Sequence, residues 1–222
     1  MYGIIDGDAL LCWVLNLTMK YSASFTAAAL LFEEINALAD ILASEERDVL
    51  LKEEIKLNQR IQVNSEKARK RKISEIKNRS KQVDKKFWEH YLSRPNENER
   101  RLLLFYLALK TYALLFDFHF DVTVLQWKNG NTEINPYYYT MKFNELEADN
   151  EEIANWSDST KEKVISRYQT MLRQAKLIEE RTIRVPQISD SFWCYFVEQG
   201  DTWFLEACFL KQIRRQQLMT TC

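Results

Sequence analysis

The longest apolar run in the sequence, LLLFYLALKTYALLF, occupies residues 102–116. It contains Lys110, leads directly into Asp117, and falls short of the about 20 consecutive apolar residues that cross a bilayer. The run therefore predicts a core helix, extending from about Glu97 to His119 and bending on toward Trp127. We expect no membrane among the partners of this protein.

The composition around this run favours an all-α fold, a multi-helix bundle. The 222 residues include only 4 Gly and 3 Pro, against a usual share of roughly 12% for the two together. Strand-rich folds need many turns at positive φ, and such turns depend on glycine. The glycines also lie too far apart for a phosphate-binding loop or a dinucleotide fingerprint; they are Gly3, Gly7, Gly130 and Gly200.

Apolar spacing and capping residues predict where the helices lie. Helical spacing begins after Thr26, Ser44 and Ser65, each placed as a cap, and residues 157–159 are placed to cap a later helix. Further helices are expected over residues 65–81, 84–92, 137–152 and 157–175, and two short aromatic-rich helices close the chain. Residues 177–186 predict one short β-ribbon.

The chain divides into three parts. Residues 1–18 have two glycines and no helical charge pattern, and Met19 opens a second start-like stretch. We interpret residues 1–18 as an extra N-terminal segment of the kind an upstream start adds. An N-terminal helical region is expected over residues 19–128 and a C-terminal one, with a winged-helix-like element, over residues 129–222. The two regions are small enough to pack as one domain.

Cysteine usage bears on the compartment. Cys12, Cys194, Cys208 and Cys222 show no C-x-x-C spacing. Sparse thiols of this kind predict reduced cysteines in a cytoplasmic protein, without a disulfide or a zinc framework.

Histidine usage argues against an enzyme. The two histidines, His90 and His119, do not lie in an H-E-x-x-H frame, so no ligand set for zinc chemistry is present. His119, between two phenylalanines, predicts a buried core histidine. We expect no catalytic residues, no metal, no cofactor and no small-molecule substrate.

Charge is segregated along the chain although the net charge is −1. Residues 67–86 hold ten basic and two acidic side chains, whereas residues 117–160 hold nine acids and two lysines. Local fields of this kind steer partners more than net charge does. The acidic segment predicts a solvated face or a docking surface for a basic partner.

The basic helix expected over residues 65–81 follows a helix and a short connection, which is helix-turn-helix-like. At 100° per residue, one side is an unbroken stripe of cationic, amide and hydroxyl side chains: Lys67, Lys70, Arg71, Ser74, Lys77, Asn78 and Lys81. Arg69, Lys72 and Arg79 lie nearer the buried side, where we expect them to pair within the protein.

A stripe of lysines is often only a solvated face. Solvated faces, however, usually interleave both signs, and like charges at helical spacing cost stability unless an anion neutralises them. Lysine and arginine bind phosphate oxygens, while Arg71 and Asn78 are able to reach base edges. Ser65 and the helix N-terminus offer further donors to a phosphate. We therefore predict that the stripe contacts duplex DNA.

A second candidate lies between residues 159 and 186, where a helix leads into the expected ribbon. The exposed side of that helix carries Lys163 and Arg167, and the ribbon carries Arg181 and Arg184. The order resembles a winged helix whose wing contacts DNA. Such helix-plus-ribbon units also serve as plain packing modules.

Several segments, in order along the chain, carry a family resemblance. They are YSASFT (21–26), LLFEE (30–34), NSEKARKR (64–71), ERRLLL (99–104), and residues 159–178, which begin STK and end MLRQAKLI. Together they resemble the BrxA family, the small components of BREX (bacteriophage exclusion) systems of bacteria.

The resemblance implies an all-helical, NusB-like fold that binds DNA and has no catalytic activity of its own. It implies double-stranded DNA and the other BREX components as partners. The expected function is thus a non-enzymatic DNA-binding subunit in phage restriction. Two alternatives remain: a protein–protein assembly adaptor of the BREX complex, and an RNA-binding protein in the manner of NusB.

Overall fold

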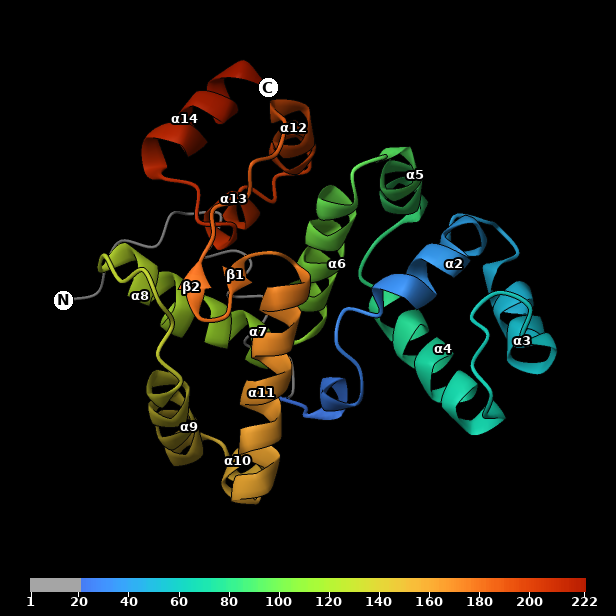
Figure 1. The fold of residues 1–222 in the computed structure, drawn as a ribbon, viewed down its shortest axis with the longest axis horizontal. Helices are drawn as coiled ribbons and strands as arrows, with labels where there is room; N and C mark the ends of the chain where they lie inside the picture. Colours follow the sequence, from blue (N-terminus) through green and yellow to red (C-terminus); the bar gives the residue numbers. More distant parts are fainter. Residues whose placement is uncertain (1–20) are drawn as a thin grey trace.

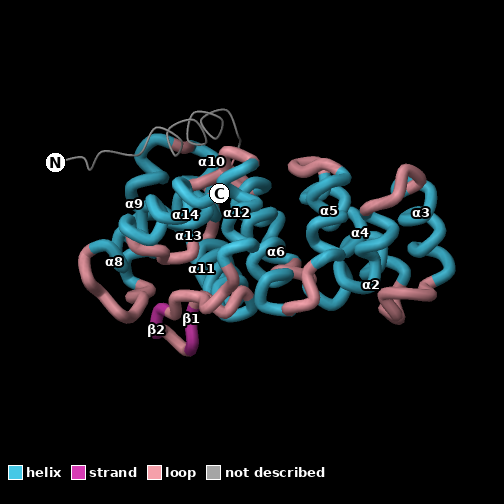
Figure 2. The backbone as a smooth tube through the Cα atoms, turned by 90° about the horizontal axis from the view of Figure 1, so that it is seen from above, coloured by secondary structure: helices cyan, strands magenta, loops and turns pink. Residues whose placement is uncertain are grey.

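The computed structural model describes residues 21–222, and the expectations for residues 1–18 and for Cys12 lie outside that part. The described chain is helical apart from one two-stranded antiparallel ribbon (Figure 1). This confirms the all-α fold with a short ribbon near residues 177–186. Figure 2 shows helices throughout, with the ribbon projecting at one edge.

The elements follow one another as η1 (Ser24–Ala27), α2 (Phe32–Leu42), α3 (Arg47–Leu57), α4 (Glu66–Ser80), α5 (Lys85–Ser93), α6 (Glu97–Thr111), α7 (Ala113–Asp117), η2 (Phe118–Val124, a π-helical stretch), α8 (Leu125–Lys128), α9 (Tyr137–Asp149), α10 (Glu151–Ala154), α11 (Asp158–Gln174), β1 (Ile178–Glu179), β2 (Thr182–Ile183), α12 (Asp190–Glu198), α13 (Trp203–Ala207) and α14 (Gln212–Thr221).

Helix α6 is the centre of the fold. Its residues 102–109 are all apolar or aromatic, and none exposes more than 3% of its surface. A helix that is apolar on every side must be covered on every side. In Figure 1, α6 lies between α2–α5 and the elements from α7 to α14, and it contacts α4, α7 and α11.

The expected single helix to His119 is wrong, because the chain breaks at Tyr112. Tyr112 has extended backbone angles, with φ −126° and ψ 106°, and α6 and the helical stretch that follows it are bent by 115°. The Tyr112 hydroxyl donates to the Glu75 carboxylate of α4. A partner this distant in the sequence gives no local signal. The helical path does continue to Lys128, as expected, but the bend comes earlier.

Within residues 21–222, no single helix is long and apolar enough to cross a membrane. The helical stretches 97–111 and 113–128 are long and apolar enough for a membrane span only when they are taken together, and they are bent against each other. The apolar residues of α6 are buried inside the core of the described chain.

Two of the expected caps are confirmed and two are wrong. Ser65 and Ser157 each accept a backbone N–H in the first turn of their helix. Asp84, at the expected start of another helix, does the same. Thr26 instead donates its hydroxyl to the Ala23 carbonyl within a short 3₁₀ turn, and α2 begins only at Phe32. Ser44 accepts from the Glu46 N–H, and α3 begins at Arg47.

The expectation that no disulfide forms is also wrong. Cys194 of α12 and Cys222, which follows α14, form a disulfide with a Cα–Cα distance of 5.3 Å. The sequence hides this pair because the cysteines are 28 residues apart and meet only when α14 packs on α12. Cys208 is a free, buried thiol, and burial raises its pKa well above the usual value.

His119 is a buried core histidine, as expected. Its Nε2 donates to the Ala207 carbonyl oxygen at 2.7 Å, so Nδ1 accepts from the Tyr168 hydroxyl, also at 2.7 Å. Burial lowers the pKa of His119 to about 4, because the charged form loses its hydration. The imidazole therefore ties η2 to α11 and α13 in its neutral form.

We predict that acidification destabilises the protein in part through His119. Its pKa is lower in the folded chain than in the unfolded chain, so its contribution is complete above the usual pKa and declines as the pH falls toward 4. The free energy of unfolding should fall by about 1.4 kcal/mol for each pH unit below that usual value. Urea unfolding at several pH values, followed by circular dichroism, measures this slope.

The matched variant is His119→Gln, which cannot titrate. Its free energy of unfolding should depend less steeply on pH than that of the wild type, whatever its absolute stability. The slope that remains includes His90, whose pKa burial and Arg94 also lower to about 4. Identical slopes in the two proteins would contradict the prediction.

Reduction should destabilise the C-terminal end of the chain. Opening a loop of this length costs about 3.6 kcal/mol in the chain-entropy account, so a reductant should lower the thermal midpoint of the wild type but not that of Cys194→Ser. Thiol titration of the unfolded protein should find two fewer reactive thiols without reductant than with it. Equal thiol counts would show that the bond does not form.

Candidate nucleic-acid interface

Helix α4 places the basic stripe as its spacing predicts. Ser65 caps it by accepting the Ala68 N–H at 3.4 Å, and Ile73 and Ile76 are fully buried on its inner side. The stripe residues that are exposed are Lys67, Lys70, Arg71, Ser74, Asn78 and Lys81, with Ser65 exposed beside them. Lys77 is half-buried, with 34% of its side chain exposed.

Intramolecular ion pairs interrupt this stripe at two points. Lys70 Nζ lies 2.7 Å from Glu66 of the same helix, and Lys77 Nζ lies 2.6 Å from Asp48 of α3. Each lysine lowers the pKa of the carboxyl beside it through a hydrogen bond and its charge. Asn78 turns toward the protein, where its Nδ2 donates weakly to the Tyr112 hydroxyl at 3.5 Å.

Three stripe cations keep their charge for a partner: Lys67, Arg71 and Lys81. None of their side chains forms an ion pair or a hydrogen bond within residues 21–222. Lys67 and Arg71 are four residues apart and therefore neighbours on the helix surface, where like charges repel. A bound anion would relieve that repulsion.

The cations expected on the inner side do pair within the protein. Arg69 donates to three backbone carbonyls before α4, those of Ile55 at 2.8 Å, Val63 at 2.7 Å and Asn64 at 3.2 Å. These bonds hold the connection between α3 and α4, which contact each other. Arg69 therefore sets the position of the basic helix without contacting a ligand.

Arg79 is a buried structural cation, only 1% exposed. Its Nε donates to Glu75 at 2.6 Å and its Nη2 to the Ala28 carbonyl at 3.3 Å. Glu75 also accepts from Tyr112. This small network joins α4 to the break after α6 and to the segment that precedes α2.

The second candidate element is brought close to the same segment. On α11, Lys163 is exposed and Arg167 is half-buried, with its Nε donating to the Thr26 carbonyl at 3.0 Å. Gln174, at the end of α11, accepts the Leu30 N–H at 2.9 Å. Residues 26–31 thus run between α4 and α11 (Figure 1).

The ribbon packs against residues 132–134 through backbone hydrogen bonds, and its tip is exposed as the tip of a wing would be. Its strand β2 donates from the Ile183 N–H to the Thr132 carbonyl at 2.8 Å, and Ile134 N–H donates to the Arg181 carbonyl at 2.9 Å. The Arg181 side chain is exposed at the tip. Arg184 is neutralised by Glu179, with contacts of 3.1 and 2.6 Å. Of the two ribbon arginines, Arg181 is the one without an ion pair to another described residue.

The acidic segment is partly neutralised within the fold. Asp121 pairs with Lys142 at 2.7 Å and Glu147 with Lys161 at 2.5 Å. Asp117 accepts the Tyr21 hydroxyl, and burial raises the pKa of Asp117 to about 6. Several other acids of α9 and α10 remain on the surface, so a docking role for this segment stays a prediction.

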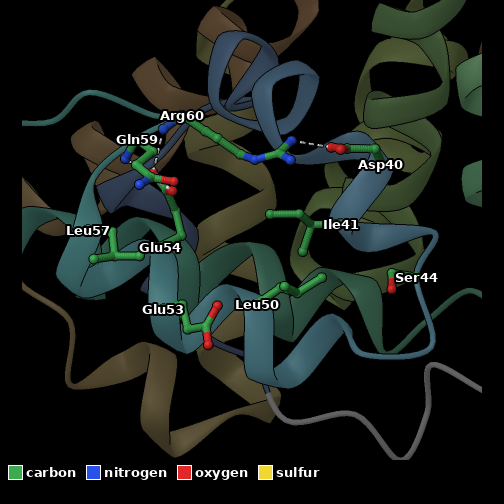
Figure 3. Close-up of a pocket in the computed structure, with 9 residues that line it drawn as sticks. All are labelled: Asp40, Ile41, Ser44, Leu50, Glu53, Glu54, Leu57, Gln59 and Arg60. Atoms are coloured by element: carbon green, nitrogen blue, oxygen red, sulfur yellow. Dashed lines mark hydrogen bonds and ion pairs between the residues drawn. The ribbon is translucent and has the colours of Figure 1, made fainter.

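A hollow of about 310 Å³ lies between the end of α2 and α3, and Figure 3 shows its lining. Glu54 is buried there and accepts the backbone N–H groups of residues 59–61 at 2.9 to 3.2 Å. Arg60 and Asp40 pair across one side at 2.5 Å. Because these polar groups serve the turn after α3, we interpret the hollow as a structural feature.

Metal ligands do not gather in the part of the chain that the structure describes: no group of three histidine, cysteine or carboxylate residues there is placed to hold an ion. Lys72 of α4 pairs with Glu34, as expected of a cation on the inner side. Sequence reasoning missed Arg101 of α6, which lines one hollow together with Lys72 and Arg167. These residues come from three distant helices, so no local pattern announces the cluster.

Comparison with known proteins supports the fold and the family. A crystal structure of an uncharacterized protein from Magnetospirillum magneticum superposes with a TM-score of 0.69, at 19% sequence identity, over 86% of this chain and 98% of that one. This likeness shows a shared fold. No curated protein matches the sequence.

The family model of BrxA matches residues 19–200, a range that includes α4, α6, α11 and the ribbon. The match spans most of the chain and agrees with the motifs between Met19 and Pro186. The protein therefore belongs to the BrxA family, a component of BREX phage-defence systems.

Proposed function

We propose that this BrxA protein is a non-enzymatic subunit that binds duplex DNA during BREX phage defence. The observation that carries the proposal is the row of unpaired cations on the exposed side of α4, at Lys67, Arg71 and Lys81. Lys163 and Arg167 of α11, across residues 26–31, extend the candidate surface.

Phosphate contacts would dominate such an interface. The available groups on α4 are two lysines and one arginine, which favour phosphate oxygens. Asn78 is held toward Tyr112, which leaves Arg71 as the better candidate for a base edge. We therefore propose binding that depends strongly on salt and weakly on sequence.

An assembly role is the second candidate, and one observation favours it. Tyr137, Tyr138 and Met141 on α9 are large apolar side chains that are 61%, 45% and 42% exposed. They accompany the surface acids of α9 and α10. A basic, apolar segment of another BREX protein would suit this surface. RNA binding is the third candidate, since phosphates are common to both nucleic acids.

We predict that neutralising Lys67 and Arg71 together flattens the salt dependence of DNA binding. The slope of log K against log salt should fall by up to about 0.9 for each phosphate that the variant no longer neutralises. A mobility shift of duplex DNA at a series of salt concentrations measures the slope for wild type and for Lys67→Gln/Arg71→Gln. The charge-matched control is Lys52→Gln/Lys211→Gln, two exposed lysines on α3 and just before α14.

An unchanged slope in the α4 variant would remove α4 from the interface. Two further arms separate the other candidates. Competition of structured RNA against duplex DNA tests the RNA alternative. Size-exclusion with purified BREX components, with and without nuclease, tests the adaptor: complexes that survive the removal of DNA favour protein–protein assembly.

A further inference from the structure

A second hollow of about 300 Å³ lies where residues 28–31 meet four helices, α2, α4, α6 and α11. Three cations from three of these helices line it: Lys72, Arg101 and Arg167. In Figure 1 this segment passes between α4 and α11, the two elements proposed to bind DNA. The volume lies at the lower end of the range for ligand pockets.

The two arginines keep donors available. Arg167 uses only its Nε, toward the Thr26 carbonyl at 3.0 Å, and its terminal nitrogens have no bond to any described residue. Arg101 lies over the Phe32 ring, with its guanidinium carbon 3.7 Å from the ring centroid. A cation–π contact of this kind holds the guanidinium in place without using its N–H donors, which remain for an oxyanion. The contact of Arg101 with Glu97 is long, at 3.5 Å.

The start of α2 lies beside the same hollow. Leu31 precedes the helix in the left-handed region, at φ 57° and ψ 39°, and no side chain caps the first turn. A left-handed leucine costs about 1 kcal/mol or more, and such strain is commonly kept where it positions a functional group. The first-turn residues Phe32, Glu33 and Glu34 line the hollow, so the positive end of the helix dipole lies at its edge.

The acids that line the hollow leave an excess of positive charge. Glu34 forms an ion pair with Lys72, so these two charges cancel. Glu33 is exposed. With Glu33 counted against Arg101 and Arg167, the lining keeps one net positive charge. The amide nitrogen of Gln174 is available because its oxygen already accepts the Leu30 N–H.

We propose that this hollow binds a phosphate group, held by Arg101, Arg167 and the first N–H groups of α2. The proposal rests on the proposed function in one respect: the phosphate would belong to the backbone of a DNA strand that crosses from α4 to α11. The same donors would accept inorganic phosphate or the phosphate of a nucleotide, and the experiment separates these sources.

The first arm tests the hollow itself, with inorganic phosphate as the probe. The thermal midpoint of the full chain is measured in sodium phosphate and in sodium chloride of equal ionic strength. Phosphate should raise the midpoint of the wild type and of the control Lys211→Gln. The rise should disappear in Arg101→Gln and Arg167→Gln, corresponding to at least about tenfold weaker phosphate binding, as expected when one charge-assisted hydrogen bond is removed. Each variant is compared with itself in chloride, so a lower basal stability does not obscure the result.

The second arm tests the DNA source. Duplex mobility shifts over a salt series should show a slope lower by up to about 0.9 in each arginine variant, with unchanged slope in Lys211→Gln. If the phosphate response is abolished in the variants while their DNA slopes stay unchanged, the site takes free phosphate, and its DNA source is refuted.

The two proposals fail separately. If phosphate raises the thermal midpoint equally in the wild type and the arginine variants, and the DNA slopes are unchanged, the hollow is not a phosphate site. The proposal that α4 binds DNA would still stand. If phosphate stabilises the wild type but the wild type binds no duplex DNA, the proposed function is refuted and the proposal of a phosphate site in the hollow stands.

Discussion

The fold depends on covering one helix that has no polar side at its middle. From Leu102 to Leu109 the surface of α6 is almost wholly buried, and each large apolar side chain removed from water contributes about 1.5–3 kcal/mol. The elements that cover α6 come from both sides of it in the sequence. Helix α4 precedes α6, and α7 and α11 follow it, and all three contact it. Both candidate DNA-binding helices are thus positioned by contact with the same core helix.

The contacts of Tyr112, where the chain turns after α6, fix the position of α4 and of the segment before α2. Its side chain meets Glu75 and Arg79 of α4, and Arg79 in turn holds the Ala28 carbonyl. Removing one member of a buried charged network leaves the others unpaired, which is costly. The network therefore couples the break in the core helix to the position of residues 28–31, and hence to the hollow between α4 and α11.

Much of this architecture could be predicted from the sequence, because helices and caps are local. Ser65 and Ser157 cap where the sequence places them, and 100° spacing alone separates the exposed side of α4 from Ile73 and Ile76. What could not be predicted depends on distant partners. Tyr112, where the core helix breaks, bonds to Glu75 of another helix, Cys194 meets Cys222 only through the packing of α14, and Arg101 joins Arg167 only across α6 and α11.

Partners within the fold, several of them distant in the sequence, also decide which positive charges of α4 are free to bind an anion. The strongly basic stretch of residues 67–86 suggests one large cationic surface, yet Arg69 and Arg79 are committed to the interior. Lys70 and Lys77 are held by exposed carboxylates, and surface pairs of this kind are worth only about 0–1 kcal/mol, so a phosphate can replace Glu66 or Asp48 at little cost. Lys67, Arg71 and Lys81 need no such exchange. A polyanion would therefore engage the unpaired cations first and recruit the paired ones as it closes on α4, while the buried arginines keep the helix in place.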